Sequence, residues 1–120
     1  MRNRWDNRIY SQDSKMNQLK LDLRKFTKDR NWESFHSPKN LAMALSVEVA
    51  ELVEIFQWMT EEQSREFNLD YWDDLMDEIG DVQIYLTMIA DYFNLCPIEC
   101  AKAKLEKNKI KYPVEGNKFS

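Results

Sequence analysis

The sequence predicts an all-α protein built on a four-helix core, and two observations carry that prediction. Glycine (2) and proline (3) are scarce among the 120 residues, so the chain has few of the turns that a sheet requires. Apolar residues also recur every three or four positions over long stretches, which is the spacing of a helix with one buried face. The predicted helices cover about residues 14–29, 38–59, 70–94 and 97–111.

Length and composition indicate one domain of ordinary globular type. The chain is 32% charged and 43% hydrophobic, and 120 residues can enclose one modest core. We expect this domain at residues 14–113, with polar tails at 1–13 and 114–120. The N-terminal tail is rich in arginine and has no helical spacing. It is either an extension without a role or a contact to a neighbouring subunit.

Charge and hydropathy disfavour several classes of function. The net charge of −4 argues against nucleic acid as the main partner, because a phosphate backbone needs a basic surface. No apolar run approaches the roughly 18 residues of a membrane span, and the N-terminus has no apolar signal core, so we expect a cytoplasmic location. Cys96 and Cys100 have no second cysteine pair beside them, so they indicate neither a disulfide framework nor a zinc site.

The first predicted helix leads into an aromatic loop. Its apolar stripe consists of Met16, Leu19, Leu23 and Phe26. Ser37 and Pro38 suit the N-cap and the first turn of the next helix, so they close the loop. The aromatic loop residues Trp32, Phe35 and His36 either cover the core or form a surface that stacks on a ligand or contacts phosphate.

An acid lies inside the apolar stripe of the second predicted helix. On a helical wheel, several apolar residues fall within about 60° of Glu48. They are Leu41, Leu45, Leu52, Ile55 and Met59. Glu51 lies one turn further on, beside Glu48. Two buried carboxylates repel each other and lose hydration, so the sequence implies a metal ion, or a Lys or Arg side chain from elsewhere, that holds them.

The third predicted helix repeats this pattern. Glu78 lies among apolar residues, and Asp81 follows it at i+3. The apolar neighbours on the wheel are Leu75, Val82, Tyr85, Ile89 and Phe93. The side expected to face solvent carries Gly80, Gln83, Thr87 and Asp91. The polar segment 60–66 before this helix predicts a short helix or a turn. Antiparallel packing of the second and third helices would bring the four carboxylates together.

Four carboxylates without an imidazole favour a hard cation. Oxygen ligands select Mg²⁺, for which Mn²⁺ can substitute, over zinc or copper. The last predicted helix is basic, and Lys104, Lys107 and Lys111 would offer charge to phosphate groups. Asn108 would add a hydrogen bond. The aromatic residues expected nearby are Trp32, Trp58 and Tyr85. Together these residues predict a site for a nucleotide polyphosphate.

The apolar faces of the second and third predicted helices lead to a predicted oligomer and to an alternative function. The second and third helices are apolar over more than half of their circumference, and four helices alone cannot cover them, which predicts a homodimer or homotetramer. The alternative to an enzyme is a non-catalytic helical interaction protein that oligomerises through these faces and pairs its internal acids with lysines.

Several segments resemble the MazG-like, all-α nucleoside triphosphate pyrophosphohydrolases. They are EVAEL at 48–52, FQW at 56–58, DEIGDVQIYL at 77–86 and KLEKNKIKYP at 104–113. A further segment, RNWESFHSPKNL at 30–41, is similar to the loop of the small dCTP-pyrophosphatase-like branch. The resemblance covers residues 19–113 and extends over most of the chain.

The resemblance implies Mg²⁺-dependent hydrolysis of a nucleoside triphosphate to the monophosphate and pyrophosphate. It implies a role in clearing the nucleotide pool with dCTP-like substrates favoured, and a bundle completed between the subunits of a dimer or tetramer. The implied metal-binding and catalytic residues are Glu48, Glu51, Glu78 and Asp81. The implied substrate-binding residues are Trp32, His36, Trp58, Tyr85, Lys104 and Asn108. Glu51 or Glu78 would orient the attacking water.

Two positions bear on the branch and the base. Val47 stands where many MazG-like proteins carry an additional Glu, which agrees with the dCTP-like branch. Leu23 stands where that branch carries a His near the base. The base preference therefore stays open, and another nucleotide such as phosphoribosyl-ATP is the alternative substrate.

Overall fold

The computed structural model describes residues 11–114, and within that range every regular element is a helix. The elements are α1 (Ser11–Asp29), η2 (Glu33–Phe35), α2 (Pro38–Phe56), α3 (Glu61–Arg65), η3 (Leu69–Tyr71), α4 (Trp72–Tyr92) and α5 (Pro97–Lys111). None of these helices combines the length and the apolar character needed to cross a membrane. The predicted all-α class is confirmed.

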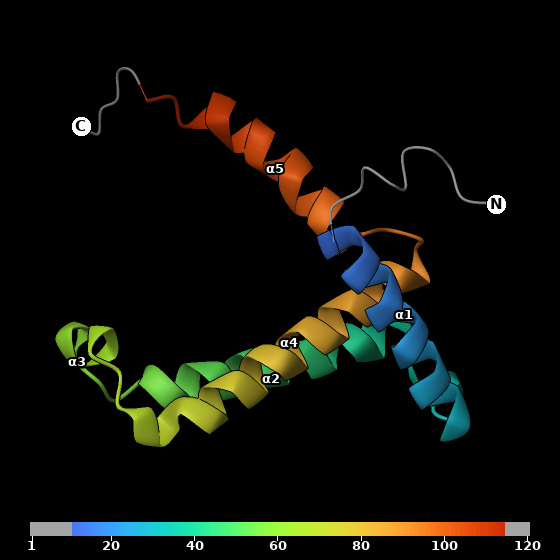
Figure 1. Cartoon of the computed structure of the whole chain (residues 1–120), viewed down its shortest axis with the longest axis horizontal. Coiled ribbons are helices and arrows are strands. Elements are labelled where there is room, and N and C mark those ends of the chain that lie inside the picture. Colours follow the sequence, from blue (N-terminus) through green and yellow to red (C-terminus); the bar gives the residue numbers. More distant parts are fainter. Residues whose placement is uncertain (1–10, 115–120) are drawn as a thin grey trace.

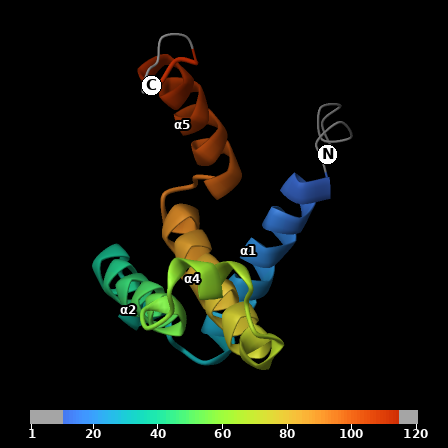
Figure 2. The same ribbon diagram turned by 90° about the vertical axis from the view of Figure 1, so that its left-hand side faces the viewer.

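The long helices α2 and α4 run antiparallel, side by side, and form the centre of the fold (Figure 1). The second view shows α4 lying between α2 on one side and α1 on the other (Figure 2). The last helix, α5, contacts the end of α4 and then extends away from the α2–α4 pair (Figure 1). The two helices that carry the acids are therefore direct neighbours, as their sequence patterns predict.

Helix boundaries differ from the predicted ones by a few residues. Helix α1 begins at Ser11, inside the predicted N-terminal tail, and α2 ends at Phe56, where Gln57 caps it. Helix α4 is shorter than predicted at both ends, because a 3-10 turn precedes it and the left-handed Asn94 follows it. The predicted Ser37 cap is present, with its hydroxyl accepting a hydrogen bond from the Asn40 N–H at 3.1 Å. Residues 1–10 and 115–120 of the predicted tails lie outside the described range.

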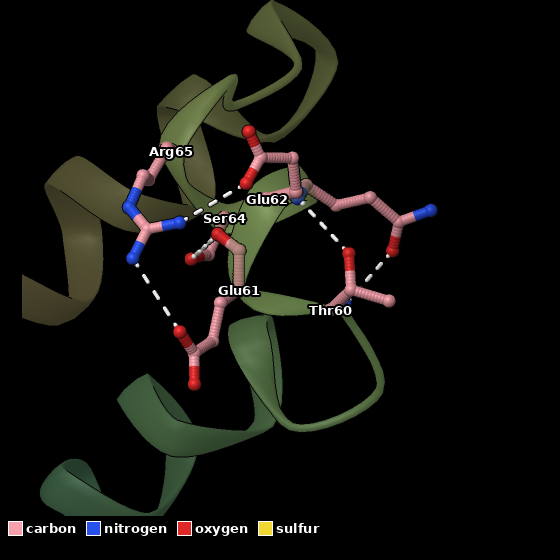
Figure 3. Close-up of polar contacts among 6 residues, drawn as sticks. Thr60, Glu61, Glu62, Ser64 and Arg65 are labelled. Carbon is pink, nitrogen blue, oxygen red and sulfur yellow. Dashed lines mark hydrogen bonds and ion pairs between the residues drawn. The ribbon is translucent and has the colours of Figure 1, made fainter.

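The predicted short helix after α2 is present as α3, and local polar contacts hold it (Figure 3). Thr60 and Gln63 form a capping box. The Thr60 hydroxyl accepts from the Gln63 N–H at 3.1 Å, and the Gln63 side-chain carbonyl accepts from the Thr60 N–H at 3.0 Å. Arg65 pairs with Glu61 and Glu62. These contacts give a five-residue helix a defined start and keep the connection between α2 and α4 compact.

Asparagine ends both α1 and α4 in this glycine-poor chain. Asn31 and Asn94 have φ values of 58° and 61°, in the left-handed region that Asn tolerates better than other non-glycine residues. After Asn31, the Trp32 N–H donates to the Thr27 carbonyl at 3.0 Å, and after Asn94 the Leu95 N–H donates to the Ala90 carbonyl at 2.8 Å. Both are Schellman-type helix ends, and the first one turns Trp32 back over α1.

One side of α4 that the sequence predicts to face solvent is covered by α1. Thr87 is fully buried, and its hydroxyl accepts from the Gln83 amide at 2.8 Å and donates to the Met16 sulfur at 3.9 Å. On the same side, Arg24 of α1 forms a two-pronged ion pair with Asp91 at 2.6 and 2.8 Å. The prediction that Thr87 faces solvent is wrong. Its side chain is small and its hydroxyl has hydrogen-bond partners in the protein, so α1 can pack closely over it.

Leu41, in the first turn of α2, is the most completely buried of the large apolar side chains described, at 2% exposure. Replacing it with Ala leaves a cavity, so we expect the free energy of unfolding to fall by about 3 kcal/mol. Urea denaturation followed by circular dichroism measures this. Ile110→Ala is the matched control, because Ile110 is 83% exposed and its truncation should cost less than about 0.5 kcal/mol. Equal losses in the two variants would contradict the packing described for Leu41.

Candidate functional site

Three carboxylates meet between α2 and α4. Glu48 comes from the middle of α2, and Glu78 and Asp81 come from adjacent turns of α4. One oxygen from each lies within 4.8 Å of the other two, and all three residues are half-buried. The i to i+3 spacing puts Glu78 and Asp81 on one face of α4, and the antiparallel packing sets Glu48 opposite them. This arrangement confirms the predicted meeting of acids for three of the four residues.

Glu51 lies beside this group rather than within it. Its charge acts on both Glu48 and Glu78, so it is a close neighbour of each. It also lines an open cleft of about 760 Å³ between α2 and the start of α4. The fourth predicted ligand therefore connects the three-acid group to a space that solvent can enter.

The cluster carries more negative charge than its surroundings balance. Burial raises the pKa of Glu48 to about 7, and the negative charges of Glu51, Asp81 and Glu78 contribute to the rise. Burial and the charge of Glu51 raise the pKa of Glu78 as well. Neither acid joins an ion pair with any Lys or Arg within residues 11–114. Pairing with lysine, the alternative open from the sequence, is therefore not what holds these acids within one chain.

The donor set fits a divalent cation. One oxygen of Glu48 and one of Glu78 are buried and have no hydrogen-bond partner among the described residues. Unpartnered carboxylate oxygens that converge on one point, with no imidazole or thiol among them, suit a hard cation that accepts oxygen ligands. Such an ion would supply the positive charge that this part of the chain lacks.

An aromatic cavity of about 250 Å³ opens next to the acids, between α1, the loop after it and α4. Trp32, His36 and Tyr85 line it, as expected for a stacking site. Trp32 packs edge-on against Phe26 at 5.6 Å between ring centroids and against His36 at 6.2 Å. Asp81 belongs both to this cavity and to the acid group, so the cavity and the acids share an edge.

Three predicted substrate residues lie elsewhere in this chain. Trp58 is 89% exposed and lines the cleft beside Glu51, not the aromatic cavity. Lys104 and Asn108 lie on α5, which extends away from the α2–α4 pair, and neither lines the cleft or the aromatic cavity (Figure 1). Of the six predicted substrate-binding residues, Trp32, His36 and Tyr85 therefore lie together next to the acids. Within one chain, Trp58, Lys104 and Asn108 do not join them.

The structure also adds residues that the sequence reading leaves out. Tyr71 and Asp74 line the cleft with Glu51 and Glu78, and Thr27 and Met88 line the aromatic cavity. Helical spacing contained a signal for two of them. Asp74 precedes Glu78 by four positions and Met88 follows Asp81 by seven, so each shares a face of α4 with an acid. Tyr71 lies in the 3-10 turn before α4 and Thr27 on α1, and the spacing around the acids gave no signal for either.

The comparison with known families decides the identity of the fold. The MazG-like family matches residues 43–119, which is more than half of the chain. The chain belongs to the MazG-like family. The match includes all four acids, so the resemblance carried by the EVAEL and DEIGD segments is confirmed.

The chain is also similar to two mammalian proteins that are named for an activity. The chain is 34% identical to dCTP pyrophosphatase 1 of Bos taurus over 100 residues, which is 79% of this chain and 57% of that protein. It is 36% identical to dCTP pyrophosphatase 1 of Homo sapiens over 93 residues, which is 73% of this chain and 53% of that protein. The chain thus spans little more than half the length of these relatives.

A solved structure agrees with the fold over most of its length. A crystal structure of a pyrophosphatase from Archaeoglobus fulgidus is 44% identical and superimposes with a TM-score of 0.77. The alignment covers 82% of this chain and 92% of that one. The MazG-like fold seen here is therefore shared with a protein of similar size.

Because the acids are close together and partly buried, we expect the stability of the protein to fall as pH rises and to recover when a metal ion binds. Glu48 has a higher pKa in the folded protein than in the unfolded chain, so its contribution to stability is full below the ordinary carboxyl range and is lost as pH rises through about 7. Metal-free protein should therefore melt at a higher temperature near pH 5.5 than near pH 8. Millimolar Mg²⁺ should recover the loss at the higher pH, as measured by differential scanning fluorimetry.

Glu48→Gln separates this effect from other titrations. The variant should lose most of the pH dependence and most of the response to Mg²⁺, whereas Glu62→Gln, in α3, should keep both. Asp91 does not confound the comparison, because its ion pair with Arg24 lowers its pKa and moves its titration to more acidic pH. Identical melting of the wild type at both pH values, with no response to Mg²⁺, would contradict an uncompensated acid cluster.

Proposed function

We propose that this protein is a Mg²⁺-dependent nucleoside triphosphate pyrophosphohydrolase that converts a (d)NTP and water to the (d)NMP and pyrophosphate. One observation carries the proposal. Three converging carboxylates without a cationic partner share an edge, through Asp81, with an aromatic cavity. A cation site beside a stacking site matches a ligand that has polyphosphate at one end and a base at the other. The dCTP pyrophosphatases among the relatives support the same reaction.

The geometry suggests how each residue acts. The base lies in the cavity with Trp32, His36 and Tyr85, and the phosphates then point towards Asp81 and the other acids. Glu48, Glu78 and Asp81, joined by Glu51, would hold Mg²⁺, which neutralises phosphate charge when bound. Glu51 faces the open cleft, from which it can orient a water molecule, and Glu78 is the other residue suited to this role. The water attacks the α-phosphorus, the bond from this phosphorus to the α–β bridging oxygen breaks, and that oxygen leaves as part of pyrophosphate.

The size of the aromatic cavity suits the base of a nucleotide. A volume of about 250 Å³ lies below the roughly 300–1,000 Å³ typical of pockets for whole ligands, so it takes only part of a nucleotide. The dCTP pyrophosphatases among the relatives favour a dCTP-like substrate, and with it a role in clearing the nucleotide pool of the cytoplasm. Another nucleotide such as phosphoribosyl-ATP stays the alternative substrate.

We further propose that a second copy of the chain completes the site. The radius of gyration is 18.0 Å, against about 14 Å for a compact chain of this length. An apolar groove of about 480 Å³ crosses α2 and α4, and Val53, Leu75 and Ile79 line it. Large apolar side chains that stay exposed on these two helices include Met43, Val47, Val49, Val53, Met76, Ile79 and Leu86. An isologous dimer would cover these faces and could bring Trp58, Lys104 and Asn108 to the site of the partner.

The reaction itself is tested by pyrophosphate release from a panel of the common dNTPs and NTPs, with Mg²⁺ and with EDTA. We expect release from the wild type that needs Mg²⁺ and is highest for dCTP or a related pyrimidine. Glu48→Gln should lower kcat/KM by at least about 100-fold, the scale on which loss of a charge-stabilising group slows an enzyme. Glu62→Gln, the same change at an exposed position in α3, should leave the rate unchanged. Release that persists in EDTA would refute the metal-dependent mechanism.

The assembly is tested by sedimentation equilibrium. We expect a mass of two or four times the 14.5 kDa of the chain. Val53→Asp puts a charge into the apolar groove and should shift the mass towards that of one chain, because a buried unpaired charge opposes association. Val114→Asp, at an exposed position beyond α5, should not. A wild type that sediments as a single chain at all concentrations would rule out the dimer.

A further inference from the structure

The aromatic cavity has a neighbour of similar size. A second cavity, of about 280 Å³, lies on the far side of its wall. Three residues line both spaces, namely Thr27 of α1, His36 of the loop and Met88 of α4. These three side chains therefore form the partition between a cavity that we assign to the base and a space to which the proposed reaction gives no role.

Two of the three partition residues are fixed in place. Thr27 is buried, and its hydroxyl lies within hydrogen-bond distance of the Leu23 and Arg24 carbonyls, at 3.0 and 3.1 Å. The backbone N–H of His36 donates to the Glu33 carbonyl at 3.1 Å, and its ring packs against Trp32. A β-branched side chain bonded to its own helix has little freedom to move. The His36 ring is kept in place by packing alone, because its buried Nδ1 has no hydrogen-bond partner within residues 11–114.

Met88 is the deformable part of the partition. Its side chain is unbranched, has three rotatable bonds and carries no group that must keep a hydrogen bond, so it can change conformation at low cost. It projects from α4 one turn beyond Tyr85, which lines the base cavity with it. Among the three partition residues, Met88 is thus the one whose side chain can most easily shift the boundary between the base cavity and the next space.

The second cavity could accept a polar ring. Arg24 and Asp91 line it as a bonded pair, and Glu33 lies on the same wall. A guanidinium group and carboxylates there offer partners to the nitrogen atoms of a heterocycle. The space beyond Met88 is therefore suited to the second ring of a purine and would not reject it on chemical grounds.

We propose that Met88 is the residue that restricts the substrate to single-ring bases, by closing the base cavity against the space beside Arg24. This inference rests on the proposed function, because it takes the base to occupy the cavity lined by Trp32 and Tyr85. Selection then comes from a steric stop and not from a hydrogen bond to the base. Shortening the side chain at position 88 should admit purines without harming the acids.

The test compares kcat/KM for dCTP, dTTP, dATP and dGTP in the wild type and Met88→Ala, with pyrophosphate release as the readout. We expect the wild type to prefer pyrimidines, and the pyrimidine-to-purine ratio to fall at least about ten-fold in the variant, the scale on which a change of pocket size alters selectivity. Leu21→Ala, a similar truncation at an exposed position of α1 (54%), should keep the wild-type ratio. Met88→Leu, which keeps most of the volume, should keep it too.

The outcomes separate the two proposals. A wild type that releases pyrophosphate from no nucleotide would overturn the proposed function and the role of Met88 with it. An active wild type that already accepts purines as well as pyrimidines would overturn only the role of Met88. So would a folded, active Met88→Ala variant with an unchanged ratio. If Met88→Ala does not fold, as judged by circular dichroism, Met88→Val removes fewer atoms and is held to the same criterion.

Discussion

The repulsion among carboxylates between α2 and α4 is the constraint on which the structure depends. Two long helices pack through apolar stripes, and in the middle of that contact they set Glu48 against Glu78 and Asp81. A fold that needed only stability would place apolar residues there, since buried acids oppose packing. The pair instead keeps the acids half-buried and unbalanced, so the contact at the centre of the fold is also the place where a cation would relieve the most repulsion.

The aromatic cavity depends on contacts of a different kind. Helix α1 closes it, and polar contacts hold α1 to α4 and to the connection that follows α4. Arg24 pairs with Asp91, and the Lys20 ammonium donates to the Leu95 carbonyl at 2.7 Å. The Schellman turn at Asn31 then directs Trp32 back over Phe26. Side chains far from the acids therefore set the shape of the space next to them.

Much of this arrangement could be predicted from the sequence because helical spacing is a local property. The spacing around Glu48 and Glu78 gave the helices, their packing faces and the meeting of three acids. It failed for Thr87, because a polar residue on a wheel looks solvated until a second helix covers it. It could not place Trp58 or α5 either, because their positions depend on tertiary packing and not on local pattern. The partition formed by Thr27, His36 and Met88 brings together residues from α1, the loop after it and α4. A helical wheel describes one helix at a time and cannot show such a contact.

The exposed apolar faces of α2 and α4 imply that the properties of the protein depend on its concentration. If a second copy of the chain covers Val53 and Ile79, as proposed, the chain gains part of its stability from that contact. Under mass action, folding and association then form one linked equilibrium, and dilution should weaken both together. If a partner chain also supplies part of the site, activity per chain would rise with the concentration of the protein. The expression level in the cell would then set the activity of each chain as well as the number of chains.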